Sequence, residues 1–161
     1  MLSRSPEQTQ KIAEILVKTL LDNPEKGPRI FCLQGNLGAG KTTFIQGIAK
    51  ALKIKNKILS PTFVIMKDFK IPGRFPFDYL YHIDCYRLEE PKEILSLGFK
   101  EITKNPKNLV FIEWPERIKK VIPKNSVWLK FRVKGKNKRG IIINSKRKTQ
   151  SSKQQLKTKN F

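Results

Sequence analysis

The sequence has few cysteines and no long hydrophobic run, and both absences exclude classes of protein. Its two cysteines, Cys32 and Cys85, lie far apart and outside any CxxC spacing. The sequence therefore has neither a zinc-ligand pattern nor the cysteine framework of a small secreted domain. No apolar run approaches the roughly 18 residues that a membrane-spanning helix needs. The amphipathic N-terminus carries Glu7 and Glu14, unlike the apolar segment of a signal peptide. We expect a cytoplasmic protein with no membrane partner, in which both thiols are reduced and buried.

Acidic residues are missing from the last part of the chain. The 161 residues include 34 Lys and Arg but only 13 Asp and Glu, which gives a net charge of +21. Up to Glu116 there are 18 bases and 13 acids, a net of +5, whereas from Arg117 onward there are 16 bases and no acid, a net of +16. Residues 144–161 also have almost nothing apolar to bury. We predict one domain over residues 1–143, followed by a basic, disordered tail over 144–161.

Local patterns predict alternating helices and strands. Helices are expected from Ser5 or Pro6 to just before Asn23, over 42–52 and over 89–97; strands over 29–34, 59–69, 79–84 and 109–113; and a terminal hairpin over 127–133 and 141–143. The strands over 59–69 and 79–84 are expected to form a hairpin. Together these elements predict a three-layer α/β fold, in which helices flank a central, mostly parallel sheet that ends in a C-terminal β hairpin.

The strongest motif is Gly35-Asn36-Leu37-Gly38-Ala39-Gly40-Lys41-Thr42, a full match to GxxxxGK[ST]. It follows a predicted strand and opens a predicted helix, which is the context that a phosphate-binding loop (P-loop) requires. In such a loop the backbone N–H groups surround the phosphates. The lysine, here Lys41, reaches the β and γ phosphates, and the threonine, here Thr42, binds Mg²⁺. Thr43 either contacts the α phosphate or only packs. The motif predicts the P-loop NTPase fold.

Two carboxylates end predicted apolar strands. Asp84 and Glu113 stand where P-loop proteins place the acid that holds the hydrated metal. We expect one of them to bind the metal and the other to orient the attacking water. Period-two alternation puts His82 on the same strand face as Asp84. His82 is either a catalytic residue or a buried, hydrogen-bonded structural one.

These residues by themselves predict a Mg²⁺-dependent nucleoside triphosphatase or a small-molecule kinase. A kinase usually needs arginines to stabilise the transferred phosphoryl group, and only Arg74 and Arg87 lie between the P-loop and Glu113. A nucleotide-regulated RNA-binding module is a further alternative, because the basic C-terminal segment would attract RNA phosphates. The tail over 144–161 has a single aromatic residue, Phe161, and so little capacity to stack on bases.

Four blocks in one order give a more specific indication. Residues 35–43, Ser60-Pro61-Thr62-Phe63, residues 82–88 and Glu113-Trp114 resemble the TsaE family, formerly YjeE, and the similarity extends from about Ser5 to Val133. The resemblance implies a small bacterial P-loop ATPase, weak when alone, that is required for threonylcarbamoyladenosine modification of tRNA. Its partners would be the TsaD and TsaB subunits, which carry out and support the transfer, while ATP hydrolysis resets their complex. The basic tail then either contacts tRNA or only aids solubility.

The resemblance also implies roles for individual residues. The expected roles are catalysis by Asp84, Lys41 and Glu113; ATP binding by Gly38, Ala39, Gly40, Lys41, Thr42, Thr43 and Thr9; Mg²⁺ binding by Thr42 and Glu113; a switch segment of Ser60, Pro61 and Thr62 with His82; and packing beside the nucleotide by Trp114. Thr9 has a helix-surface alternative and Trp114 a core alternative. Asn36 stands where the family usually has Asp, but this position offers mainly its backbone to the phosphates, so ATP binding is expected to survive.

Overall fold

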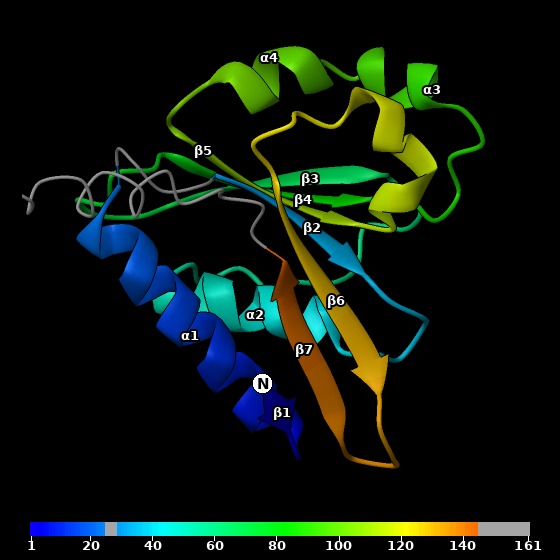
Figure 1. Ribbon diagram of the computed structural model, residues 1–161. Coiled ribbons are helices and arrows are strands. Elements are labelled where there is room, and N and C mark those ends of the chain that lie inside the picture. The colour runs from blue at the N-terminus through cyan, green and yellow to red at the C-terminus, as the bar shows by residue number, and fades with distance from the viewer. Residues whose placement is uncertain (25–28, 145–161) are drawn as a thin grey trace, which may run out of the picture.

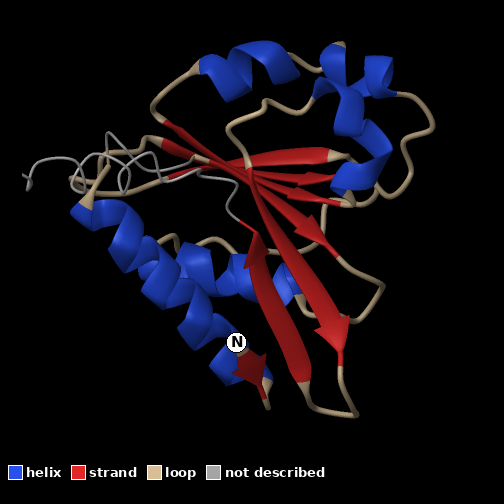
Figure 2. Cartoon of the chain, in the orientation of Figure 1, coloured by secondary structure: helices blue, strands red, loops and turns tan. Residues whose placement is uncertain are grey.

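A seven-stranded sheet crosses the molecule, with helices packed on both of its faces (Figures 1 and 2). The computed structural model describes residues 1–24 and 29–144. The elements are β1 (Leu2–Ser3), α1 (Pro6–Asp22), β2 (Ile30–Gln34), α2 (Lys41–Ala51), β3 (Met66–Lys70), β4 (Tyr79–Asp84), α3 (Pro91–Leu95), α4 (Phe99–Lys104), β5 (Asn108–Glu113), a 3₁₀ helix (Pro115–Val121), β6 (Val127–Val133) and β7 (Arg139–Asn144). Of the tail predicted over 144–161, Asn144 is instead the last residue of β7, because it continues the pairing with β6, and the rest lies outside the described residues.

The strand order places the ends of three central strands at one edge. The order is β1-β7-β6-β2-β5-β4-β3. The four central strands, from β6 to β4, run parallel, whereas β7, β1 and β3 pair antiparallel with their neighbours. The expected α/β fold is confirmed, although the mostly parallel arrangement applies to the centre of the sheet and the sheet as a whole is mixed. The register pairs Asp84 with Glu113 and Leu33 with Glu113, so the carboxyl ends of β2, β5 and β4 lie side by side.

Each face of the sheet has its own hydrophobic core, because successive side chains of a strand point to opposite faces. α1 and α2 cover one face, where Phe31 stacks on Phe111 with ring centroids 4.9 Å apart. α3, α4 and the 3₁₀ helix cover the other, where Cys32 and Cys85 are buried with Phe99 (Figure 1). The burial of both thiols is as expected. The sheet is thus packed between two helical layers.

Most predicted elements are confirmed, with small shifts at their ends. α1 begins as expected, because the Ser5 hydroxyl accepts a hydrogen bond from the Gln8 N–H and Pro6 lies in the first turn. The pairing of β3 with β4 and that of β6 with β7 are also as predicted. The structure adds three short elements without a clear periodic pattern: β1, α4 and the 3₁₀ helix. Among the described residues no helix is long and apolar enough to cross a membrane.

The strand predicted over 59–69 is wrong in its first half. β3 begins only at Met66, and the preceding residues form a turn in which the Pro61 carbonyl accepts hydrogen bonds from the N–H groups of Val64 and Ile65. Pro61 itself has no N–H to donate to a neighbouring strand. Ile65 has a φ of 67°, which also prevents an extended backbone there. The segment is therefore a loop beside the ends of the central strands.

Candidate functional site

The phosphate-binding loop leaves the carboxyl end of β2 and passes directly into α2. Gly40 precedes α2 with a φ of 96°, a left-handed conformation that favours glycine. Gly35 is required for a different reason, which is lack of space: a Cβ atom there would lie 2.6 Å from the Phe131 carbonyl oxygen of β6. The local sequence thus allows the loop to curl tightly against the sheet, and the first N–H groups of α2 face the space that the loop surrounds. Such N–H groups bind anions.

The Lys41 side chain lies within this loop. Its Nζ donates hydrogen bonds to the carbonyl oxygens of Gly35, at 2.7 Å, and Asn36, at 3.1 Å. It also lies 4.4 Å from the centroid of the Trp114 ring. Burial lowers the pKa of Lys41 below its usual value, and the nearby carboxylates of Glu113 and Asp84 partly offset this effect. The ammonium group is therefore held beside the loop N–H groups, where it can meet a phosphate chain.

Glu113, at the end of β5, forms the second part of the site. Its Oε1 accepts a hydrogen bond from the Thr42 hydroxyl at 2.8 Å and lies 2.9 Å from His82 Nε2. Both bonds use the same oxygen, and no described residue donates to Oε2. Hydroxyl and carboxylate oxygens are ligands that Mg²⁺ prefers, in company with the oxygens of a bound phosphate. Within residues 1–24 and 29–144 no group of three or more His, Cys, Asp or Glu forms a metal site by itself. The pair therefore fits a metal that is held jointly with a nucleotide.

Asp84, at the end of β4, binds the loop that precedes β3. Its Oδ2 accepts hydrogen bonds from the hydroxyls of Ser60, at 2.5 Å, and Thr62, at 2.7 Å, while its Oδ1 accepts one from the Tyr86 N–H. Ser60 and Thr62 are themselves 2.8 Å apart. The carboxylate thus ties the segment predicted as a switch to the edge of the sheet. This tie explains why residues 60–62 do not continue as a strand.

The described hydrogen bond of His82 is to Glu113 and not to the 60–62 segment, with which His82 was grouped as a possible switch. Its side chain is fully buried, and Nδ1 has no hydrogen-bond partner among the described residues. The bond from Nε2 to Glu113 fixes the orientation of the carboxylate. The geometry thus favours the alternative in which His82 is a buried, hydrogen-bonded residue.

A single hollow brings most of the predicted residues together. It is lined by Leu37, Gly38, Ala39, Gly40, Lys41, Thr42, Thr43, Ser60, Thr62, Asp84, Tyr86, Glu113 and Trp114. Trp114 lines this hollow, with a φ of 56° and its ring centroid 5.1 Å from that of Tyr86. Pro61 and His82 are buried behind it.

Thr9 lies outside this hollow, on the outer side of the phosphate-binding loop. It is only 2% exposed, so it is not a helix-surface residue. Its hydroxyl is 2.8 Å from that of Ser3. Its methyl group and Arg139 Cγ would each lie 3.9 Å from a Cβ atom built on Gly40. Thr9 therefore packs against the loop and has its hydroxyl bonded elsewhere.

Arg139 is a residue of the site region that sequence reasoning missed. From the start of β7 its Nε donates to the Gly38 carbonyl oxygen at 3.0 Å, and its Nη1 donates to carbonyl oxygens of its own hairpin at Gly135 and Lys138. The guanidinium therefore joins the β6–β7 hairpin to the phosphate-binding loop. No local signal marks this contact, because the two partners are 101 residues apart.

Comparisons with known proteins show the family of the chain. The family model described as threonylcarbamoyl adenosine biosynthesis protein TsaE matches residues 3–141. The chain belongs to the TsaE family. This member is 38% identical over 151 residues to a Rickettsia conorii protein named tRNA threonylcarbamoyladenosine biosynthesis protein TsaE, covering 92% of this chain and 80% of that protein. A protein of the same name from Aquifex aeolicus is 34% identical over 146 residues, and the match covers 89% of this chain and 93% of the Aquifex protein.

A solved structure extends the similarity to the fold. The crystal structure of Bacillus subtilis YdiB superposes on this TsaE family member with a TM-score of 0.67 and 28% sequence identity. The match covers 90% of this chain and 83% of that one. The chain is thus a member of a family involved in tRNA threonylcarbamoyladenosine biosynthesis, with a P-loop fold typical of nucleotide-binding enzymes.

Proposed function

We propose that this protein is a Mg²⁺-dependent ATPase of the cytoplasm that supports threonylcarbamoyladenosine modification of tRNA. In this proposal its ATP hydrolysis acts on a complex of the TsaD and TsaB subunits, and it does not transfer the group itself. One observation carries the proposal: the P-loop faces two carboxylates, Asp84 and Glu113, which are paired in register on adjacent strands. Phosphate loops combined with strand-end acids are typical of nucleoside triphosphatases.

The first part of the mechanism is binding of the triphosphate. The N–H groups of Gly38, Ala39 and Gly40 and of the start of α2 surround the phosphates, while Lys41 exchanges its bonds to the loop carbonyls for phosphate oxygens. Thr42 and Glu113 would hold Mg²⁺, which neutralises charge on the phosphates when bound. His82 keeps the Glu113 carboxylate oriented through its Nε2.

The second part is positioning of the attacking water. Asp84 lies beside Glu113 and accepts hydrogen bonds from Ser60 and Thr62, so it is placed to orient a water and to transmit a change in the 60–62 segment. A γ phosphate offers acceptor oxygens to the same two hydroxyls. We infer that ATP binding changes the bonding of Asp84 in this way, which links nucleotide state to the shape of the loop.

The partner complex is proposed to dock around this hollow. Large apolar side chains are exposed there, and the most exposed are Leu37 at 85%, Phe63 at 82% and Val64 at 64%. Exposed apolar patches on otherwise polar surfaces mark sites of protein association. The Arg87 guanidinium lies 4.2 Å from the Phe63 ring and adds a charged rim. A partner in contact with this loop would sense the nucleotide directly, in keeping with an ATPase that is weak alone.

The test is ATP hydrolysis by the purified protein, alone and with TsaD and TsaB from the same organism. We expect a slow basal rate that rises when the partners are added, is lost in Lys41→Ala and is retained in the control Lys55→Ala, an exposed lysine outside the hollow. Phe63→Ala should reduce the stimulation by partners, whereas Ile15→Ala, an exposed apolar control on α1, should not. A fast rate that is indifferent to the partners would contradict the proposal.

A further inference from the structure

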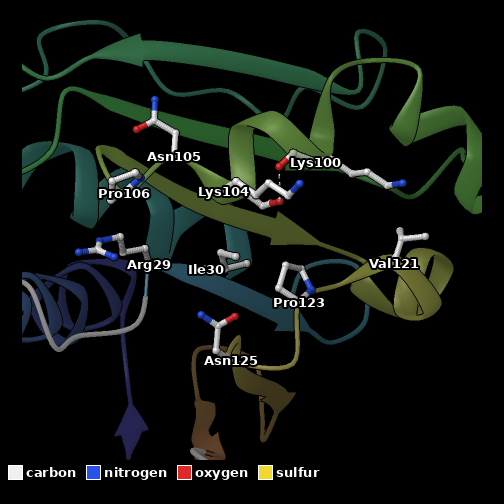
Figure 3. Close-up of a pocket in the computed structure, with 10 residues that line it drawn as sticks. Arg29, Ile30, Lys100, Lys104, Asn105, Pro106, Val121, Pro123 and Asn125 are labelled. Atoms are coloured by element: carbon white, nitrogen blue, oxygen red, sulfur yellow. Dashed lines mark hydrogen bonds between the residues drawn. The ribbon is translucent and has the colours of Figure 1, made fainter.

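A second hollow lies at the opposite edge of the sheet from the phosphate-binding loop (Figure 3). It has a volume of about 600 Å³, within the size range of ligand sites. It lies between the starts of the central strands, the end of α4 and the segment that follows the 3₁₀ helix, and its lining residues are Arg29, Ile30, Lys100, Thr103, Lys104, Asn105, Pro106, Val121, Pro123 and Asn125. Nothing in the proposed ATPase mechanism uses these residues. We refer to it as the basic groove.

Among the described residues, three cations and no carboxylate line the groove. Lys100 and Lys104 are one helical turn apart in α4, where residues at i and i+4 lie on the same side, and both are exposed. Neither lysine forms an ion pair with a described residue. Arg29 donates from Nη2 to the Pro24 carbonyl oxygen at 3.2 Å, while its Nε is buried and has no partner among the described residues. The described residues that line the groove therefore carry positive charge that no salt bridge within the described chain neutralises.

The arrangement of these cations indicates an extended anion. In Figure 3 the side chains of Arg29, Lys104 and Lys100 are spread across the opening and do not point at one spot. Two further exposed lysines, Lys107 and Lys124, are adjacent in the sequence to the lining residues Pro106 and Pro123. A single phosphate or carboxylate would contact only part of this surface, whereas a chain of phosphates can contact all of it.

The uncharged lining decides which part of a nucleic acid would be recognised. The uncharged walls include aliphatic and amide side chains, such as Val121, Pro123 and Asn125, and no aromatic ring of residues 1–24 or 29–144 lines the groove. Bases bind proteins without sequence preference mainly by stacking on aromatic rings. A groove with cations and amides but no ring suits the sugar-phosphate backbone, which carries no sequence information.

The groove is separate from the nucleotide site. Ile30 begins β2, and the phosphate-binding loop follows the other end of the same strand at Gln34. A strand of five to six residues spans roughly 17–20 Å. A ligand in the groove would therefore leave the triphosphate site accessible, and the two can be tested independently.

We propose that the basic groove binds the phosphate backbone of RNA without sequence specificity, and that the RNA is the tRNA on which the family's pathway acts. The choice of RNA over an acidic protein rests on the spread of cations, the lack of carboxylates and the family's involvement in tRNA modification. The proposed RNA binding does not depend on ATP hydrolysis by this protein. Binding here would bring this protein and its pathway's substrate together through charge.

The experiment measures binding of a fluorescently labelled tRNA transcript to the full chain by anisotropy, over a series of salt concentrations. The test variant is Lys100→Ala with Lys104→Ala. The control is Lys55→Ala with Lys57→Ala, an exposed pair that removes the same charge on another part of the surface. Each lost phosphate contact lowers the slope of log affinity against log salt by about 0.7 to 0.9. We expect the groove variant to lower this slope by about 1.4 to 1.8 and to weaken tRNA binding about tenfold at 0.1 M salt. The control pair should change neither the slope nor the affinity by much.

Three outcomes would overturn the proposal. Equal weakening by the control pair would show that binding follows net charge alone. No effect of the groove variant would place RNA binding elsewhere in the chain. Competition by polyglutamate as strong as that by unlabelled tRNA would indicate an acidic protein as the ligand. Binding of a fluorescent ATP analogue should be unchanged in the groove variant, which distinguishes failure here from failure of the proposed ATPase function.

Discussion

Glu113 lies at the centre of a buried hydrogen-bond network that joins β5 to β4 and α2. The carboxylate is only 3% exposed, and its partners are the Thr42 hydroxyl and His82 Nε2. Buried polar groups cost free energy when they lose their partners. The fully buried His82 depends on Glu113 for the one hydrogen bond that its ring makes in the described structure. Substitutions of Glu113 can therefore separate the effect of its charge on hydrolysis from the effect of its hydrogen bonds on stability.

Two substitutions of Glu113 are expected to differ in their effect on stability. Glu113→Gln keeps a side-chain oxygen for Thr42 and His82 but removes the charge, so we expect near-normal stability, retained ATP binding and a roughly 100-fold lower rate of hydrolysis with the partners. Glu113→Ala leaves His82 Nε2 without its acceptor and should also lower the free energy of unfolding by about 1–3 kcal/mol. Urea denaturation and the ATPase assay measure the two effects. A wild-type rate in either variant would show that the role assigned to Glu113 is wrong.

At the scale of elements, the β6–β7 hairpin supports the phosphate-binding loop. Arg139 bonds to the Gly38 carbonyl oxygen and to its own hairpin, while β7 also pairs with β1, which precedes the helix of Thr9. The loop is thus packed between the N-terminal segment and the hairpin. A change in the conformation of the hairpin should therefore alter nucleotide binding through the Arg139 contact.

Arg139→Ala is expected to weaken ATP binding about three- to tenfold, because the loop loses a charge-assisted hydrogen bond at a partly exposed position. Lys138→Ala is the matched control, since it removes the same charge from the same hairpin at an exposed position. Titration with a fluorescent ATP analogue compares the two. Equal effects would show that only the hairpin's charge matters to the nucleotide.

The contact between α1 and α2 is close at Gly47. A Cβ atom there would lie 2.6 Å from Gln10 Cα and 2.9 Å from Ala13 Cβ. Gly47→Ala should therefore destabilise the protein by about 1–3 kcal/mol, as overpacked substitutions do, although alanine is normally the better helix former. Gly135→Ala is the control, since the nearest atom to its Cβ would be 3.9 Å away. Thermal or urea unfolding of both variants provides the measurement, and a stabilised Gly47→Ala would contradict the observed packing.

At the scale of the whole molecule, both cysteines report on the integrity of the core. Cys32 and Cys85 are fully buried between the sheet and the layer of α3, α4 and the 3₁₀ helix. Burial raises the pKa of the Cys32 thiol to about 12 and raises that of Cys85 as well. The reactive form of a cysteine is the thiolate. Both thiols should therefore be unreactive while the fold is intact.

We expect a thiol reagent at pH 8 to leave the folded protein unlabelled and to label both cysteines in urea. Because the folded pKa values lie above the unfolded ones, the stability that these thiols contribute is complete below about pH 9 and is lost as pH rises towards 12. Labelling rates over a urea series, compared with circular dichroism, test this. Fast labelling of one cysteine before unfolding would place that thiol outside the core.

Features that depend on neighbouring residues were predictable. The Ser5 cap, the GxxxxGK[ST] loop and the carboxylates that end β4 and β5 follow from local hydrogen bonding and backbone preference. The boundary of β3 was predictable only in part. Pro61 has no N–H for a strand ladder and is a local signal against a strand, but the bonds that hold Ser60 and Thr62 come from Asp84, more than 20 residues away, and no local pattern marks them.

The sequence by itself determined that this chain folds as a P-loop domain, with the loop, Lys41, Thr42 and two strand-end acids, since these depend on short-range chemistry. Only the tertiary structure decided which partners they have: Glu113 with His82, Asp84 with Ser60 and Thr62, and Gly38 with Arg139. It also decided that Arg29, Lys100 and Lys104 share one groove. The physical reason is that these contacts arise from strand order and helix packing, which bring together residues with no local pattern in common.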